Sequence, residues 1–166
     1  VGKRGISKKK VEGDKITPKG TFKIKCLFYR KDRVKKIKTS LKRISLKENM
    51  GWCDDPKSKF YNKLIFFPFS YGAEKLYLKE NVYDMILILN YNMKPIIKKR
   101  GSAIFIHIAK RRYTKTEGCI AISKKDMRLL LKNLNKKSKI TVYWFLLPNI
   151  KLPILKNVVL YFNAFL

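Results

Sequence analysis

The chain has 166 residues, which is the size of one domain and enough to bury a hydrophobic core. Hydrophobic residues make up 46% and aromatic residues 13%, which excludes an intrinsically disordered polymer. Lysine and arginine number 40 against 11 acidic residues, giving a formal net charge of +29. This charge predicts attraction to polyanions such as an anionic cell-wall polymer or a membrane surface, although the wide spread of the lysines favours a general compositional bias.

The charge is accompanied by no recognisable nucleic-acid-binding motif, so we expect no specific nucleic-acid partner. The cysteines are Cys26, Cys53 and Cys119, without a CxxC spacing, and His107 is the only histidine. Structural zinc sites use four cysteine or histidine ligands, so we expect no structural zinc site. Cys26 and Cys53 are interpreted as buried apolar residues. The sequence does not indicate an oligomeric state.

Residues 1–142 are expected to form the main domain, followed by an apolar tail over residues 143–166. The chain begins at Val1 and shows no signal-peptide pattern, which leaves open whether a leader or an upstream segment precedes it. No window reaches about 18 uninterrupted apolar residues, the length of a membrane-spanning helix. We interpret the tail as strands and turns packed on the domain, with a contact to a membrane surface or a partner as the alternative.

Taken in chain order, the first signals are a turn at residues 17–20 and a strand at residues 21–28. Thr-Pro-Lys-Gly is typical of a turn, and the following alternation places Phe22, Ile24, Cys26 and Phe28 on one face. Residues 31–63 are irregular. A second strand is predicted at residues 85–89, which are apolar throughout.

A third strand is predicted at residues 103–108, with Ala103, Phe105 and His107 on one face. After a loop and a short apolar stretch, Ser123 is typical of a helix N-cap for residues 124–134. Residues 140–146 form the last predicted strand. The predicted fold class is therefore mainly β, a sandwich or barrel-like sheet with one principal helix.

The chemistry that the sequence suggests lies at His107 and Cys119. A free cysteine thiol has a pKa of about 8.5, and imidazole is the usual partner that helps it to react as a thiolate. The loop between the two residues can fold back, and Gly118 permits close backbone approach beside an oxyanion. The alternative interpretation is a half-buried histidine beside a cysteine of the core.

These residues resemble the catalytic domain of L,D-transpeptidases of the YkuD type. In that family a histidine and a loop precede Ser/Thr-x-Gly-Cys, and His107, Thr116, Gly118 and Cys119 match this pattern. Residues 12–22 resemble the family's "EGD–TP–G–F" segment. Residues 51–56 with Tyr61-Asn62, and Tyr83-Asp84, resemble further blocks in the same order. The resemblance runs from about residue 2 to residue 142 and implies an L,D-transpeptidase-like β fold.

The resemblance also implies a reaction, with Cys119 as nucleophile, His107 as its base and Gly118 beside them. Cys119 would form a thioester with a peptidoglycan stem peptide and pass it to an amine, or to water in an L,D-carboxypeptidase. The resemblance implies no metal and no cofactor. The implied location is periplasmic or cell-wall-associated. A non-catalytic domain that binds cell wall or another polyanion remains the alternative from a different class.

Two departures from the family affect substrate recognition. Glu117 replaces a histidine found in many members, and Ala121 stands where they carry an arginine, a natural carboxylate ligand. Candidate substrate-binding residues are Thr116, Ser102, Arg111 and Arg112. Arg111, Arg112 or Lys110 could take the place of the missing arginine, although solvated charges are the favoured interpretation of these loop residues. Asp54 and Asp55 either bind a substrate amine or form a local turn before Pro56, and the turn is favoured.

Overall fold

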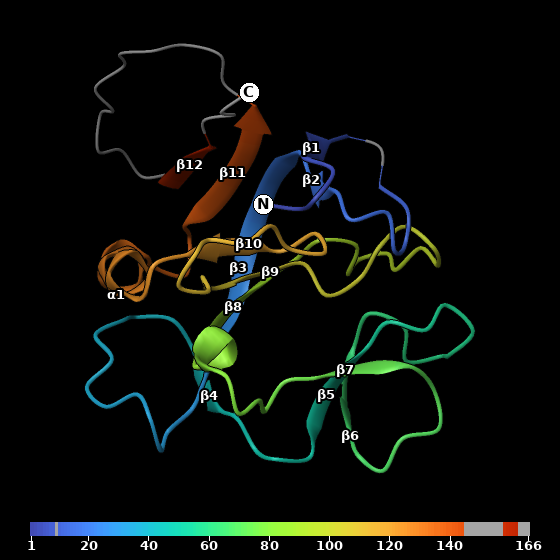
Figure 1. Cartoon of the computed structure of the whole chain (residues 1–166), viewed down its shortest axis with the longest axis horizontal. Coiled ribbons are helices and arrows are strands. Elements are labelled where there is room, and N and C mark those ends of the chain that lie inside the picture. Colours follow the sequence, from blue (N-terminus) through green and yellow to red (C-terminus); the bar gives the residue numbers. More distant parts are fainter. Residues whose placement is uncertain (9, 145–157, 163–166) are drawn as a thin grey trace.

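The structure, a computed structural model, describes residues 1–8, 10–144 and 158–162. Its main sheet has seven strands in the order β10-β9-β8-β3-β11-β12, with β4 also paired to β3 (Figure 1). The central strand β3 is ten residues long and pairs antiparallel with both β8 and β11. The strands of this sheet are β3 (Gly20–Tyr29), β4 (Arg43–Ser45), β8 (Met85–Leu89), β9 (Phe105–Ile108), β10 (Ile120–Ile122), β11 (Lys139–Trp144) and β12 (Val158–Phe162).

Two smaller sheets flank the main one. A three-stranded antiparallel sheet contains β5 (Met50–Cys53) between β6 (Leu64–Phe66) and β7 (Ala73–Lys75). A two-stranded parallel sheet joins β1 (Ile6–Ser7) to β2 (Thr17–Pro18). Figure 1 shows these two sheets at opposite ends of the main sheet. The 3₁₀ helix η1 (Asn81–Tyr83) leads directly into β8.

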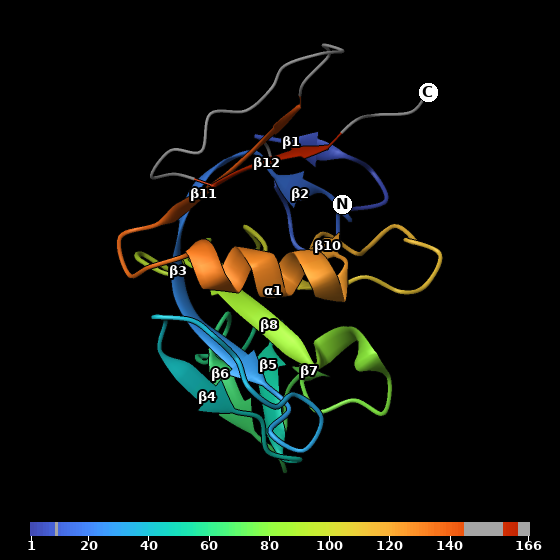
Figure 2. The same cartoon turned by 90° about the vertical axis from the view of Figure 1, so that its left-hand side faces the viewer.

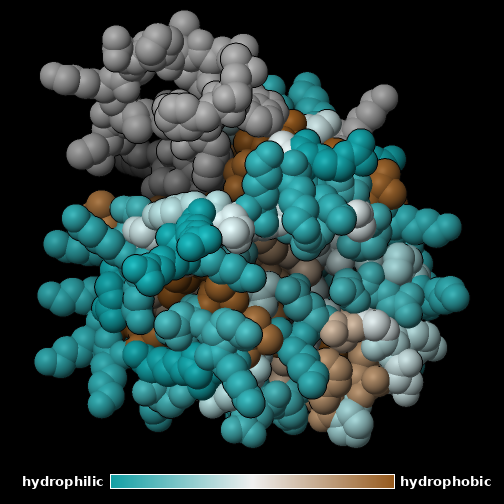
Figure 3. Space-filling model, in the orientation of Figure 1, coloured by the Kyte–Doolittle hydropathy of each residue, from teal (hydrophilic) through white to brown (hydrophobic). Residues whose placement is uncertain are grey.

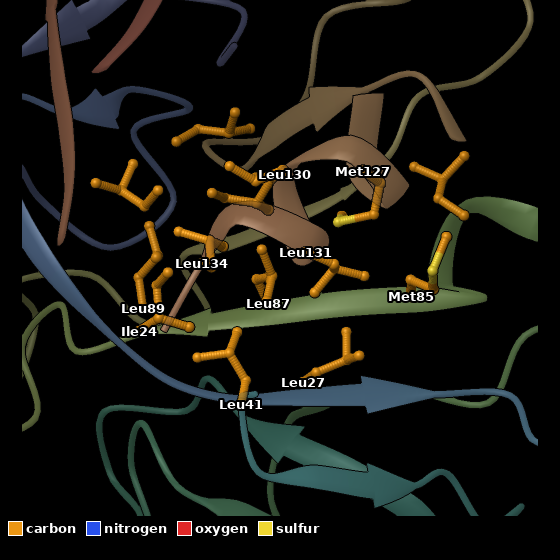
Figure 4. Packing of buried hydrophobic residues seen from close by; sticks show 14 of the residues in the cluster. Ile24, Leu27, Leu41, Met85, Leu87, Leu89, Met127, Leu130, Leu131 and Leu134 are labelled. Atoms are coloured by element: carbon orange, nitrogen blue, oxygen red, sulfur yellow. The ribbon is translucent and has the colours of Figure 1, made fainter. Parts of the chain in front are cut away.

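Helix α1 (Lys124–Asn133) covers one face of the main sheet (Figure 2). Ser123 caps it by accepting the Asp126 N–H at 3.0 Å, so the predicted capping is confirmed. Its buried side chains pack over β8 and β3, as Figure 4 shows for Leu131, Leu87 and Leu27. Burial of this apolar surface is the main term that holds the helix to the sheet.

The opposite face of the main sheet is covered as well, which explains why β8 and β9 are buried at every position. Trp52 of β5 lies edge-on against Phe105 of β9, with ring centroids 5.2 Å apart. Leu76 and Tyr83 complete this second cluster, and Cys119 packs at its border. The reactive residues predicted from the sequence therefore lie on the face opposite α1.

The mainly β fold class with one principal helix is confirmed; α1 is the only α-helix in the described part of the chain. The strands predicted at 21–28 and 85–89 and the helix at 124–134 are also observed, within about one residue at each end. The strand predicted at 140–146 is observed as far as residue 144, and residues 145–146 lie outside the described residues.

Three local predictions were wrong. Residues 17–18 form a strand instead of part of a turn, because they pair with β1. The strand predicted from residue 103 begins at Phe105, because Ala103 has a positive φ of 50°. A register shift between Ile24 and Cys26 sends these two side chains into different clusters, since a bulge reverses the alternation of a strand.

The C-terminal tail contributes β12, which pairs in parallel with β11. Residues 145–157 and 163–166 lie outside the described residues, so the packing of the whole tail stays a prediction. Hydrophilic side chains cover most of the face seen in Figure 3. Among the described residues, no helix is both long and apolar enough to cross a membrane.

Candidate active site

The pairing of β9 with β10 brings the two predicted reactive residues to one face. The strands are parallel, with Ile120 opposite Ile106 and Ala121 opposite His107. Cys119, one residue before β10, therefore lies at the level of Phe105, whose N–H donates to the Cys119 Sγ at 3.4 Å. Because side chains alternate along a strand, Cys119 and His107 project to the same side of the sheet as diagonal neighbours.

Both side chains line one cavity of about 860 Å³. Its wall is formed by the end of β9, the loop that precedes Cys119, and the segments around Glu12, Asp54 and Glu74. Ser102 and Thr116, predicted as substrate-binding residues, also line it. Arg111 and Arg112 do not, and both are exposed, while Lys110 and Lys115 of the same loop reach the cavity.

The Cys119 thiol is held as a neutral group. It donates to the Ala103 carbonyl oxygen at 3.0 Å. Burial, followed by the negative charge of Glu74, raises the pKa of the thiol to about 12. This differs from the thiolate that the sequence suggests, because desolvation of the sulfur disfavours its charged form. Because the thiolate is the nucleophilic form of cysteine, a thiol held in this way would have to lose its proton in order to react.

His107 is fixed in the tautomer that a general base requires. Its Nδ1 lies 2.9 Å from the Ile108 carbonyl oxygen, which can only accept, so Nδ1 carries the hydrogen and Nε2 keeps its lone pair. The Tyr83 ring lies edge-on to the imidazole, with centroids 5.4 Å apart. Burial lowers the pKa of His107, so the ring is neutral at neutral pH.

The loop before Cys119 is shaped by Thr116 and Gly118. Gly118 has a φ of +136°, and a Cβ there would lie 3.0 Å from the Ile16 carbonyl oxygen, which explains the glycine. The Thr116 hydroxyl donates to the Cys119 carbonyl oxygen at 2.6 Å and accepts the Gly118 N–H at 3.2 Å. Thr17, from the "TP" of the first family block, donates to the Gly118 carbonyl oxygen at 2.9 Å.

The segment that receives the Cys119 thiol is fixed by Asn62. Its side-chain oxygen accepts the Trp52 indole N–H at 2.9 Å and the Ala103 N–H at 3.1 Å. Its side-chain nitrogen donates to the carbonyl oxygens of Tyr91 and Asn92. Asn62 is 3% exposed, so these bonds are made away from water. The blocks at residues 51–62 thus position the reactive sulfur through Ala103.

The sequence interpretation missed an acidic side of the cavity. Glu74 accepts the Tyr83 hydroxyl, and Glu12 accepts the Tyr61 hydroxyl at 2.5 Å. Burial raises the pKa of Glu74 and that of Asp54. Glu74 carries no motif signal; its one clue is that acidic residues are scarce in this chain. Glu12 and Tyr83 were noticed only as parts of family blocks.

The two aspartates considered together separate in the structure. Asp55 forms the predicted turn, since its carboxylate accepts the Lys57 N–H at 2.9 Å and its carbonyl oxygen accepts the Ser58 N–H. Asp54 lines the cavity instead. Cys26 and Cys53 are buried and free, as expected, and Trp52 is a core residue. Within the described ranges, no three histidine, cysteine or acidic side chains are grouped so as to hold a metal ion.

Comparison with known proteins gives one match. The family model of the L,D-transpeptidase catalytic domain (YkuD) matches residues 1–142. Neither the curated proteins nor the solved structures give a significant match. The matched residues include the whole cavity described above and end within β11.

Proposed function

The chain belongs to the family of L,D-transpeptidase catalytic domains, and we propose from this that it is a cysteine acyltransferase acting on peptidoglycan stem peptides. The observation that carries the proposal is the common cavity of Cys119 and His107, with the imidazole in the tautomer of a base. This arrangement favours nucleophilic catalysis over passive binding of a polyanion.

In the proposed first step, Cys119 Sγ attacks the carbonyl carbon after the L-configured diamino acid of a stem peptide. The thiol proton passes to His107 Nε2, and a tetrahedral oxyanion forms. The bond to the terminal D-amino acid then breaks, and His107 returns the proton to the departing amine. The products are a thioester on Cys119 and a free D-amino acid.

In the second step an acceptor amine attacks the thioester carbonyl. His107 takes a proton from the attacking nitrogen, and the released Cys119 sulfur regains a proton as the new amide forms. If water attacks instead, the same path is that of an L,D-carboxypeptidase. The two outcomes differ only in the nucleophile that reaches the acyl-enzyme. The products of the reaction therefore identify the acceptor.

We assign oxyanion stabilisation to the backbone N–H groups of Gly118 and Cys119. In the resting site the Gly118 N–H donates to the Thr116 hydroxyl at 3.2 Å, and in the proposed transition state it would turn to the oxyanion. Ser102 and Lys110 or Lys115 are proposed to contact the peptide, since all three line the cavity. We propose a periplasmic or cell-wall location, in keeping with the family's action on the cell wall.

The test is incubation of the protein with a tetrapeptide stem, followed by mass spectrometry of the products. Release of the terminal D-amino acid together with an amide to an added amine supports transfer. Release with only the shortened peptide supports hydrolysis. If no D-amino acid is released with or without an amine, while the protein still binds cell-wall material, the non-catalytic alternative replaces this proposal.

A further inference from the structure

Four acidic side chains line the cavity beside Cys119, in a chain with 11 acidic and 40 basic residues: Glu12, Asp54, Glu74 and Glu117. Glu117 pairs with Lys3 and Lys15, which leaves Glu12, Asp54 and Glu74. In the described part of the chain, none of the three forms an ion pair with a lysine or arginine. The carboxylates that do form such pairs lie elsewhere or at the cavity rim: Asp14, Asp32, Asp84 and Glu117.

The Asp54 carboxylate is repelled by Glu12 and in turn repels Glu74. Burial raises the pKa of Asp54, and the charge of Glu12 adds to this; burial raises the pKa of Glu74, and the charge of Asp54 adds to this. Phenol hydroxyls satisfy one oxygen of Glu12 and one of Glu74, and no hydrogen bond from another side chain to Asp54 is found among the described residues. Such a group is complementary to a cation that enters the cavity.

Two of the four lysines that line the cavity, Lys3 and Lys10, are committed to other partners, and Lys110 and Lys115 form no ion pair with these carboxylates in the described part of the chain. Lys10 donates to Asp14 at 2.5 Å and to the Val11 carbonyl oxygen at 3.0 Å. Lys3 pairs with Glu117. The acidic side chains also do not form a group suited to a metal ion within the described ranges. A cation with hydrogen-bond donors, brought by a ligand, fits these carboxylates better than a metal ion or a lysine of the chain.

Ser102 supplies an independent sign of a ligand at the same place. It lines the same cavity and is only 6% exposed. No hydrogen bond of normal geometry to its hydroxyl is found among the described residues, and the Tyr61 hydroxyl that lies close enough to interact with it already donates to Glu12. A buried hydroxyl without a partner costs free energy unless a bound molecule satisfies it.

From these observations we propose that Glu12, Asp54 and Glu74, with Ser102, form a subsite for a primary ammonium group on the peptide that acylates Cys119. The inference rests on the proposed function for the identity of that peptide. The group that the subsite recognises is the side-chain ammonium of the donor residue. The subsite offsets the repulsion that a chain of net charge +29 exerts on a cationic substrate.

The ammonium is assigned to the donor and not to the attacking acceptor for a chemical reason. Carboxylates stabilise the protonated form of an amine, and a protonated amine has no lone pair with which to attack the thioester. A group held as a cation therefore serves recognition. Glu74 and Cys119 line the same cavity, so the subsite lies within reach of a side chain on the residue that Cys119 attacks.

The test measures binding of two stem tetrapeptides to the full chain carrying Cys119→Ala, so that no acylation occurs. One peptide has a free side-chain amine, and the other is acetylated there. We expect the free peptide to bind about 10- to 100-fold more tightly, the usual worth of a charged hydrogen bond. Asp54→Asn or Glu74→Gln reduces this preference to below about threefold, whereas Asp55→Asn, the matched neighbour outside the cavity, retains it.

Equal affinity of the two peptides overturns the subsite, whatever the variants do. A preference that survives both Asp54→Asn and Glu74→Gln in folded protein also overturns it. If acetylation changes only the transfer to an added amine and leaves binding of the stem peptide unchanged, the assignment of the ammonium group to the donor is wrong. The proposed function is tested separately, by looking for a thioester on the parent protein. If no thioester forms there but the binding preference is intact, the proposed reaction is wrong and the subsite is still supported.

Discussion

The Cys119 thiol donates its hydrogen to the Ala103 carbonyl oxygen, with 3.0 Å between sulfur and oxygen. This contact couples the nucleophile to the segment that Asn62 holds in place, so the reactive sulfur is positioned before any substrate arrives. It also favours the neutral thiol over the thiolate. The resting site is therefore a neutral pair, and in the proposed mechanism His107 has to act as a base during the attack.

The first prediction concerns the reactivity of Cys119 toward iodoacetamide. Since burial raises the thiol pKa to about 12, the thiolate fraction rises about tenfold per pH unit between pH 7 and 9.5. Alkylation, followed by peptide mass spectrometry, should show this slope in the native protein, whereas the unfolded protein should level off near pH 9. A native rate that is already maximal at pH 8 would show that the thiol is activated at rest.

The second prediction concerns His107 as base. His107→Ala should slow acylation of Cys119 by a stem peptide about 10²–10⁴-fold, the usual effect of losing a positioned general base. Circular dichroism should show that the variant remains folded, because the Ile108 carbonyl can be satisfied by water from the cavity. An acylation rate within about threefold of the parent in folded protein would remove His107 from the mechanism.

The third prediction concerns the pH below which acylation of Cys119 slows. Burial lowers the pKa of His107 from its ordinary value of 6.5, so the imidazole stays neutral as the pH falls through 6.5. The acylation rate should therefore begin to fall only below pH 6.5. The folded protein binds fewer protons at this group than the unfolded chain, so His107 also makes unfolding easier below pH 6.5. A midpoint above pH 6.5 would contradict the lowered pKa.

The fourth prediction concerns Asn62. Asn62→Ala leaves the Trp52 and Ala103 N–H groups without their acceptor in a buried place, which should lower the free energy of unfolding by about 2–4 kcal/mol. Acylation should also slow, because Ala103 no longer holds the thiol. Asn133→Ala is the control: its side chain makes one exposed bond to Leu129, and a loss of about 0.5 kcal/mol is expected. Urea unfolding of both variants provides the comparison.

The sequence alone predicted the elements whose cause is local. The apolar run 85–89 is a strand buried on both faces, and Ser123 with Asp126 begins α1 as a cap. The parallel pairing of β9 with β10 agrees with the expectation that the loop after His107 folds back. We further predict that the Cys119 and His107 side chains approach within about 4 Å, directly or after a rotamer change.

Features that depend on distant residues were not predictable in this way. The bulge in β3 is a property of its pairing with β8, and the short strand at Thr17 exists only because β1 lies beside it. Glu74 reaches the site through β7, in a sheet that pairs residues far from Cys119 in sequence. The raised pKa of Cys119 likewise follows from burial, which spacing along the chain does not reveal.

The most direct test of the account is intact-mass spectrometry of the protein incubated with a stem tetrapeptide. We predict a covalent adduct of the acyl mass on the parent and on Cys26→Ala and Cys53→Ala, because Cys26 and Cys53 are buried and do not line the cavity. Cys119→Ala should form no adduct. An adduct of equal yield on Cys119→Ala, or none on the folded parent, would contradict the assignment of Cys119 as the nucleophile.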